Sequence, residues 1–220
     1  MRAIVVVACL GLLLWVEPAS AQQTPPVVYT VRVSANPTIL GLSRGKLKNL
    51  LAESSRVLSS CGVTFKLDAT RPVTRFQMPR NIGNAGHLEA VHRVTACGST
   101  PNCIDVKIVS TIKHCKKRDD DGVVGCAFRR PENGPKTVII ARSQTQDIRH
   151  LVLAHEFGHT TGLQHRQDDP VALMNCSMDT STGVVTDAEC KCFRAGPVLP
   201  VGSRLPECRK PDPPGDCPNN

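Results

Sequence analysis

The chain has 220 residues, a formal net charge of +8, 40% hydrophobic residues and only 3% aromatic residues. This length is sufficient for one domain with a hydrophobic core. The scarcity of aromatic residues and the dispersed lysines and arginines argue against a nucleic-acid-binding surface. The positive charge favours solubility or, as the alternative, contact with acidic partners or anionic surfaces.

An apolar run near the N-terminus is followed by small residues. The run covers residues 3–16 and precedes Ala19-Ser20-Ala21, which has the A-x-A form of a signal-peptide cleavage site. It is shorter than the roughly 20 apolar residues that cross a bilayer, and no second such run follows. We therefore expect a signal peptide over residues 1–21, a secreted or periplasmic product, and no membrane span.

The remaining chain alternates between strand and helix patterns. Alternating or continuous β-branched and apolar residues predict strands at residues 27–33, 63–67, 104–109, 123–128 and 137–141. Leucines at helical spacing predict an amphipathic helix within residues 42–60, with Ser43 as its cap. Residues 69–103 are interrupted by prolines and glycines, and we expect at most a short helix there, near residues 87–94. A later helix is expected from about residue 146 to 161, and Thr186-Asp187-Ala188-Glu189 has the form of a capping box that opens the last one.

Residues 155–165 read His-Glu-Phe-Gly-His-Thr-Thr-Gly-Leu-Gln-His, which has the form HExxHxxGxxH. Residues four apart lie on one face of a helix, so His155 and His159 can direct two imidazoles at one metal ion. Glu156 is offset by about 100° and can lie beside the metal without binding it. Gly162 can adopt the positive φ that ends a helix, after which the returning chain brings His165 as a third ligand.

Three neutral histidines and one open position suit a single catalytic zinc ion. Such a zinc lowers the pKa of its bound water to about 7 and polarises the scissile carbonyl. Glu156 would remove the proton of that water as general base and later deliver it to the leaving amine. A surface helix with incidental histidines is the alternative, but the motif fixes five positions in eleven. We expect surface roles for the other histidines of the mature chain, which are His87, His92, His114 and His150.

The motif, together with Ala172-Leu173-Met174-Asn175 shortly after it, resembles the metzincin clan of zinc endopeptidases. The resemblance implies an α+β zincin fold, with a mixed twisted sheet, an antiparallel edge strand, a backing helix and an active-site helix. It also implies that Met174 lies beneath the metal and supports the histidines without binding it. The position after the third histidine is Arg166, which matches none of the matrixins, astacins, serralysins and reprolysins, so the family within the clan is unassigned.

In the clan, peptide substrates add as a further strand along the edge of the sheet. The resemblance therefore implies substrate binding along the short strand and its preceding turn, at Gly122, Val123, Val124, Gly125, Cys126 and Ala127. We expect a monomer that acts on a peptide or protein substrate, and a separate inhibitor is one route to latency. The run Asp119-Asp120-Asp121-Gly122 offers calcium ligands but lacks the full EF-hand pattern, so a solvated turn is favoured.

These features predict a secreted zinc endopeptidase, whose catalytic domain covers residues 22–195 and is followed by a Pro-, Gly- and Cys-rich tail at residues 196–220. One alternative is a catalytically quiet zinc-binding module or toxin of the same fold, against which the intact Glu156 argues. A second alternative is a zinc amidase that acts on cell-wall peptides, which the positive charge would suit.

Ten of the 11 cysteines follow the predicted cleavage site, and an even number in an exported chain indicates disulfides. The connectivity is open, but we expect local bonds Cys97–Cys103 and Cys208–Cys217, and a bond Cys115–Cys126 between neighbouring strands. We also expect Cys176 to pair with Cys190 or Cys192. A zinc site at Cys190 and Cys192 is the competing interpretation, although their spacing suits zinc poorly.

Overall fold

The structure is a computed structural model, and it describes residues 25–70, 73–94, 97, 100, 102–115, 118–119, 123–128, 136–142, 147–196 and 208. The predicted signal peptide, most of the predicted tail, and the acidic run at Asp120, Asp121 and Gly122 lie outside the described residues. Among the residues that are described, no helix is both long enough and apolar enough to cross a bilayer.

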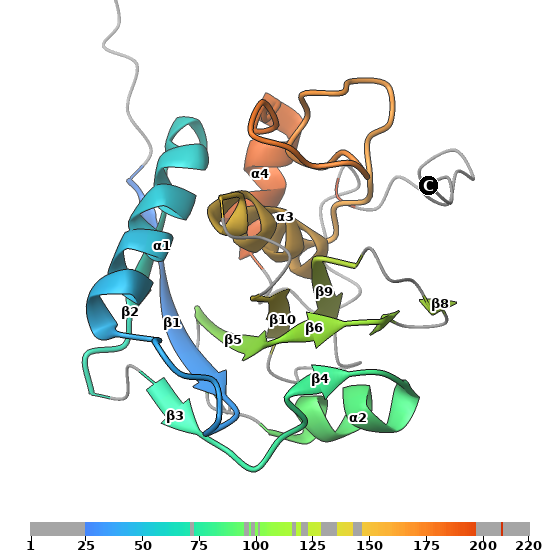
Figure 1. The fold of residues 1–220 in the computed structure, drawn as a ribbon. Helices are drawn as coiled ribbons and strands as arrows, with labels where there is room; N and C mark the ends of the chain where they lie inside the picture. The colour runs from blue at the N-terminus through green and yellow to red at the C-terminus, as the bar shows by residue number, and fades with distance from the viewer. Residues whose placement is uncertain are drawn as a thin grey trace, which may run out of the picture.

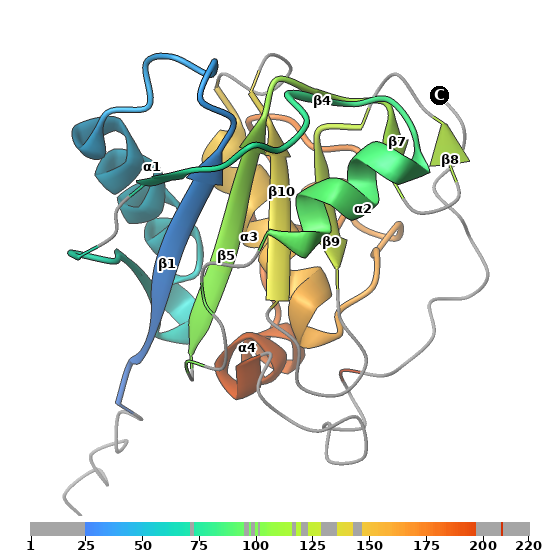
Figure 2. The same cartoon turned by 90° about the horizontal axis from the view of Figure 1, so that it is seen from below.

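The five predicted strands are confirmed and form one sheet (Figures 1 and 2). They are β1 (Val27–Ala35), β2 (Val63–Leu67), β5 (Cys103–Val109), β9 (Gly125–Phe128) and β10 (Lys136–Ala141), in the spatial order β2-β1-β5-β10-β9. A sixth strand, β3 (Val73–Arg75), which the sequence did not indicate, pairs with the far end of β1. The pairing of β9 with β10 is antiparallel and the other pairings of this sheet are parallel, so the predicted antiparallel edge strand is confirmed.

Among the described residues, four helices cover the faces of the sheet. They are α1 (Arg44–Val57), α2 (Ala85–Arg93), α3 (Arg149–Thr161) and α4 (Asp187–Ala195), and the short 3-10 turn η1 (Ser59–Cys61) follows α1. Ser43 caps α1 and Thr186 with Glu189 forms the capping box of α4, as the sequence predicts. The predicted start of α3 near residue 146 is wrong, because Ile148 has non-helical backbone angles and the helix begins at Arg149.

The two faces of the sheet carry cores of different size. In Figure 1, α1, α3 and α4 lie on one side of the sheet and α2 lies on the other. Alternation along β10 divides its side chains between the two cores, with Val138 and Ile140 toward α3 and Ile139 and Ala141 toward α2. Two short pairs of strands accompany the α2 side, namely β4 (Asn81–Ile82) with β6 (Thr111–Ile112), and β7 (His114–Cys115) with β8 (Arg118–Asp119).

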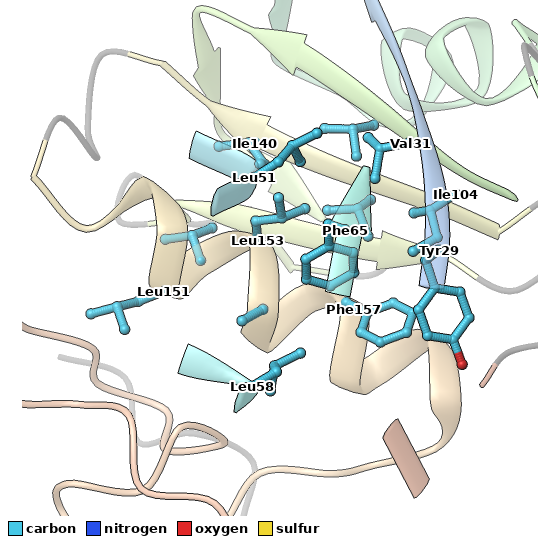
Figure 3. Close-up of a cluster of buried hydrophobic side chains, with 14 of the residues drawn as sticks. Tyr29, Val31, Leu51, Leu58, Phe65, Ile104, Ile140, Leu151, Leu153 and Phe157 are labelled. Carbon is cyan, nitrogen blue, oxygen red and sulfur yellow. The ribbon is translucent and has the colours of Figure 1, made fainter. Parts of the chain in front are cut away.

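An aromatic cluster fixes α3 against the sheet (Figure 3). The ring centroid of Phe157 lies 4.8 Å from that of Tyr29 on β1 and 5.1 Å from that of Phe65 on β2. Such pairs contribute about 0.5–1.5 kcal/mol each beyond the burial of their area. The Tyr29 hydroxyl also donates a hydrogen bond to the carbonyl of Phe193 in α4, with an O–O distance of 3.0 Å. The helix α3 is therefore held on its inner face by the core of the sheet.

Of the disulfides between described residues, two are local and two join segments farther apart in the sequence. The predicted bonds Cys97–Cys103 and Cys115–Cys126 are confirmed. The expected pairing of Cys176 with Cys190 or Cys192 is wrong, and so is Cys208–Cys217, because Cys190 bonds to Cys61 and Cys192 bonds to Cys208. Residues two apart on a helix point about 200° apart, so Cys190 and Cys192 reach different elements. Both thiols are oxidised, which also excludes the competing zinc site there. These bonds are compatible with an extracellular or periplasmic protein.

Candidate metal centre

The first two histidines of the motif lie on α3, a helix buried along most of its length. His155 and Glu156 are only 3% and 6% exposed. The helix has no side-chain cap at its first residue, so packing against the sheet and α1, rather than capping, supports it. The backbone that carries His155, Glu156 and His159 is therefore held by core packing, which favours a fixed geometry at the site.

Gly162 ends α3 as predicted. Its φ is 119°, in the left-handed region that favours glycine, and its N–H donates to the carbonyls of Gly158 and His159. The N–H of Leu163 also donates to the Gly158 carbonyl, at 3.1 Å. The chain leaves the helix axis here and carries His165 back toward the other two histidines.

The three imidazoles converge on one point. The Nε2 atoms of His155 and His159 lie 3.0 Å apart, those of His159 and His165 lie 3.1 Å apart, and those of His155 and His165 lie 3.3 Å apart. Within the part of the chain that the structure describes, these residues are the group of histidine, cysteine or acidic side chains placed to hold a metal ion. The expected convergence of His155, His159 and His165 is therefore observed.

Hydrogen bonds to carbonyls determine the tautomers of the two helical histidines. The Nδ1–H of His155 donates to the Leu173 carbonyl at 2.7 Å, and the Nδ1–H of His159 donates to the Leu163 carbonyl at 2.9 Å. A carbonyl can only accept, so the proton of each neutral ring is on Nδ1 and the lone pair is on Nε2. Burial, together with the neighbouring His165, lowers the pKa of His155 to about 4, which keeps this ring neutral near pH 7.

The group fits a zinc ion. A zinc ion bound about 2.0–2.1 Å from each nitrogen in a tetrahedron separates its ligand nitrogens by about 3.3 Å, close to the observed triangle. The Nδ1–H bonds to carbonyls are the outer contacts that orient metal-bound imidazoles and raise their basicity. The Nε2 lone pairs of His155 and His159 face each other at 3.0 Å and would repel without a cation between them. The donor set, its spacing and its tautomers therefore all suit zinc.

Two glycines allow close approaches at the site. A Cβ at Gly125 on β9 would lie 2.5 Å from Oε1 of Glu156, and a Cβ at Gly158 on α3 would lie 2.5 Å from Sδ of Met174. Glu156 therefore packs directly on the backbone of the edge strand, and the fully buried Met174 packs directly on the active-site helix. The sequence predicts no supporting role for Gly158 and no contact of Gly125 with Glu156. Glycine inside a strand and inside a helix is the signal that could have indicated both.

Neither the known protein-family models nor the curated protein sequences match this chain. Among solved structures, its fold is similar to metalloproteinase-II from Bacteroides fragilis, with a TM-score of 0.50 and 14% identity over 79% of this chain. The fold is shared with a metalloproteinase. The match covers 55% of that protein's chain, so this chain spans about half of its length. The archaemetzincin of Methanopyrus kandleri aligns with a TM-score of 0.47 and 17% identity, over 77% of this chain and 87% of that one.

The predicted substrate edge is only partly described. Gly122 lies outside the described residues, Val123 and Val124 are half-buried, and Gly125, Cys126 and Ala127 are buried. Among the strands that are described, β10 alone pairs with β9, which therefore ends the sheet beside α3. Cys126 points to the α2 face, where it bonds to Cys115. The structure thus divides these residues between a face near Glu156 and the opposite face.

The remaining described histidines do not join the group. His87 is exposed, as predicted, and its Nδ1 accepts the N–H of Gly83. His92, His114 and His150 are half-buried, with part of each residue at the surface. They lie on α2, β7 and α3, and none is among the residues placed to hold a metal.

Proposed function

We propose that the protein is a zinc-dependent endopeptidase of the metzincin type. The observation that carries the proposal is the triangle of Nε2 atoms from His155, His159 and His165, with edges of 3.0–3.3 Å. The fold shared with a metalloproteinase supports it, and so does the buried Met174 in contact with the active-site helix. We extend the proposal to a secreted or periplasmic product whose catalytic domain covers residues 22–195.

In this proposal His155, His159 and His165 hold the zinc through Nε2. When bound, zinc polarises the scissile carbonyl and acidifies water. The Glu156 carboxylate takes the proton of the attacking water and delivers it to the leaving amine. Because Gly125 has no side chain, this carboxylate can pack against the backbone of β9. A side chain at that position would displace it.

A peptide substrate would lie along β9 as an added strand, since this strand ends the sheet and borders α3. Main-chain hydrogen bonds to an edge strand hold a peptide extended without reading its sequence. That arrangement would bring the scissile bond toward Glu156, because Gly125 on the same strand contacts that carboxylate. The substrate class we propose is therefore an extended peptide or an unfolded protein segment.

The test is Glu156→Gln, which removes the base but keeps the shape of the side chain. We expect one zinc per chain in both wild type and variant, and a loss of peptide hydrolysis of about 100-fold or more in the variant. Glu89→Gln is the matched control, because Glu89 is exposed on α2, on the other face of the sheet, and pairs with Arg93 in the same helix. Undiminished hydrolysis by Glu156→Gln would disprove the proposed mechanism.

The same assay separates the two alternatives. A wild-type protein that binds zinc but cleaves no member of a peptide library would be a catalytically quiet zinc-binding module. Release of soluble fragments from cell-wall material, without cleavage of protein substrates, would identify a zinc amidase. Chelator-sensitive cleavage of denatured protein supports the endopeptidase.

A further inference from the structure

Arg166, the residue directly after the third histidine, is surrounded by carboxylates. Its Nη2 lies 2.5 Å from Oδ2 of Asp169, its Nη1 lies 3.1 Å from Oε2 of Glu189, and its Nε lies 3.7 Å from Oδ1 of Asp168. The Arg166 side chain is 22% exposed and that of Glu189 only 10%, whereas that of Asp168 is 80% exposed. The contact with Glu189 is therefore the one best shielded from solvent, that with Asp169, whose side chain is 31% exposed, is less so, and shielding strengthens an ion pair that also has hydrogen bonds.

Glu189 connects Arg166 to α4. Its Oε2 also accepts the N–H of Thr186 at 2.7 Å and the hydroxyl of Thr186 at 2.9 Å, as part of the capping box. The helix itself is fixed by two disulfides, from Cys190 to Cys61 and from Cys192 to Cys208. The guanidinium of Arg166 is thus bound to an anchored helix that lies 23 residues farther along the chain.

The backbone of Arg166 is held from the other side by the segment that contains Met174. Its N–H donates to the Met174 carbonyl at 2.7 Å, and its carbonyl accepts from the side-chain amide of Asn175 at 3.2 Å. The same amide donates to the Asp169 carbonyl at 2.9 Å. Both the main chain and the side chain of the residue next to His165 are therefore fixed by contacts outside α3.

From this geometry we infer that Arg166 is a positioning residue, which sets the His165 imidazole against the two imidazoles on α3 through its contacts with Glu189 and Asp169. The inference rests on the proposed zinc site. His165 needs such support because it follows the end of α3, so the helix does not determine where its ring lies. Contacts that orient a metal-binding side chain change metal affinity about 10–100-fold when they are removed.

The test measures the zinc dissociation constant of the full chain by competition with a chelator, using Zn²⁺ alone. We expect Arg166→Gln to weaken zinc binding about 10–100-fold. Arg166→Lys should weaken it less, because lysine keeps the charge but loses the planar fork that reaches two carboxylates. Arg93→Gln is the matched control, since Arg93 is exposed on α2 and pairs with Glu89 in the same helix, and it should leave the constant unchanged.

Glu189→Gln provides a second route to the same contact if Arg166→Gln does not fold. This variant keeps a side-chain oxygen for the cap of α4 but removes the charge opposite Arg166, and we expect weaker zinc binding here as well. An unchanged constant in folded Arg166→Gln or folded Glu189→Gln would overturn the inference and leave Arg166 a structural residue. A wild-type chain that binds no zinc would overturn the proposed function instead, so the two failures are distinguishable.

Discussion

His155 and His159 reach the metal position from a helix, whereas His165 reaches it from a loop, and the two arrangements are stabilised differently. The helical pair is aligned by its spacing of four residues and by Nδ1–H bonds to the carbonyls of Leu173 and Leu163. His165 is placed by the turn at Gly162 and by ion pairs of its neighbour Arg166. The group of three histidines thus combines two side chains that are fixed by local backbone geometry with one, His165, that is fixed by tertiary contacts.

This difference has an energetic consequence. The helical histidines are part of the folded core, since α3 packs on the sheet with Phe157 between Tyr29 and Phe65. A change there alters both the free energy of unfolding and metal binding. A change at His165 should alter metal binding with less effect on unfolding, because this side chain is half-buried whereas that of His155 is buried. Substitutions in the two regions should therefore separate metal binding from the free energy of unfolding.

The largest effect on the reaction rate should follow Gly125→Ala. This substitution on β9 acts on Glu156, which lies on α3 between the two helical histidines. A Cβ there would lie 2.5 Å from Oε1 of Glu156 and 2.8 Å from Cγ1 of Val152, so the carboxylate must move. A displacement of about 1 Å at a reacting group costs about 100-fold in rate, so we expect kcat to fall by that factor while zinc content stays at one per chain. Steady-state kinetics and metal analysis give both numbers.

Gly45→Ala is the matched control for this prediction, because the nearest atom to its added Cβ is Oγ of Ser43 at 4.0 Å. It should leave kcat unchanged. If Gly125→Ala retained wild-type kcat, the contact between β9 and Glu156 would have no part in positioning the carboxylate.

The next largest effect should be a difference in thermal stability between His155→Ala and His165→Ala, measured in the zinc-free protein. His155 is buried, and its removal leaves a void and takes the Nδ1–H donor from the Leu173 carbonyl, which costs about 2 kcal/mol. For a domain of this size that lowers Tm by about 4–8 °C. His165 is half-buried, and its replacement should change the free energy of unfolding by about 0.5 kcal/mol or less.

Thermal unfolding in the presence of a chelator measures this difference. Without the chelator, added Zn²⁺ should raise Tm in the wild type and much less in either variant, because a ligand that binds only the folded state stabilises it. Equal losses of Tm in the two chelated variants would contradict the proposed contrast between helical and loop ligands.

The smallest effect should follow Thr186→Ala, which removes the capping box of α4 but leaves the pairing of Glu189 with Arg166. The loss of a cap costs about 1 kcal/mol, equivalent to about 2–4 °C in Tm. Ser43→Ala removes the corresponding cap of α1, whose Oγ accepts the N–H of Lys46 at 3.2 Å, and should cost a similar amount. Zinc affinity should fall slightly in Thr186→Ala and stay unchanged in Ser43→Ala. An equal change of zinc affinity in the two variants would show that α4 has no special link to the site.

The features that the sequence predicted correctly depend on neighbours along the chain. The strands, the glycine that ends α3, the caps and the facing pair of helical histidines each follow from a few adjacent residues. The outer contacts of the site depend instead on segments brought together by folding, such as the Leu173 carbonyl and the Glu189 carboxylate. No pattern in the neighbouring sequence distinguishes these two groups, so the spacing of residues alone could not identify them as contacts of the site.

The central strand gives a second example of this limit. In β5, Asp105 and Lys107 alternate with apolar residues, a pattern that ordinarily indicates one side facing water. Both side chains are instead fully buried and paired, with Nζ of Lys107 2.6 Å from Oδ2 of Asp105. Lys107 also donates to the Val94 carbonyl beyond the end of α2. Burial of a charge requires such a partner, and only the folded structure shows that each is present.

The bond between Cys61 and Cys190 has a consequence for how the protein is made. The two cysteines are 129 residues apart in sequence, and the strands β2 to β10 all lie between them. During synthesis, Cys97 and Cys103 emerge before Cys190, so either can reach the Cys61 thiol before its final partner is available. Thiol–disulfide exchange must then be able to release those wrong bonds, since the correct one can close only late. An oxidising compartment that also contains an isomerase is therefore the setting in which this chain should mature efficiently.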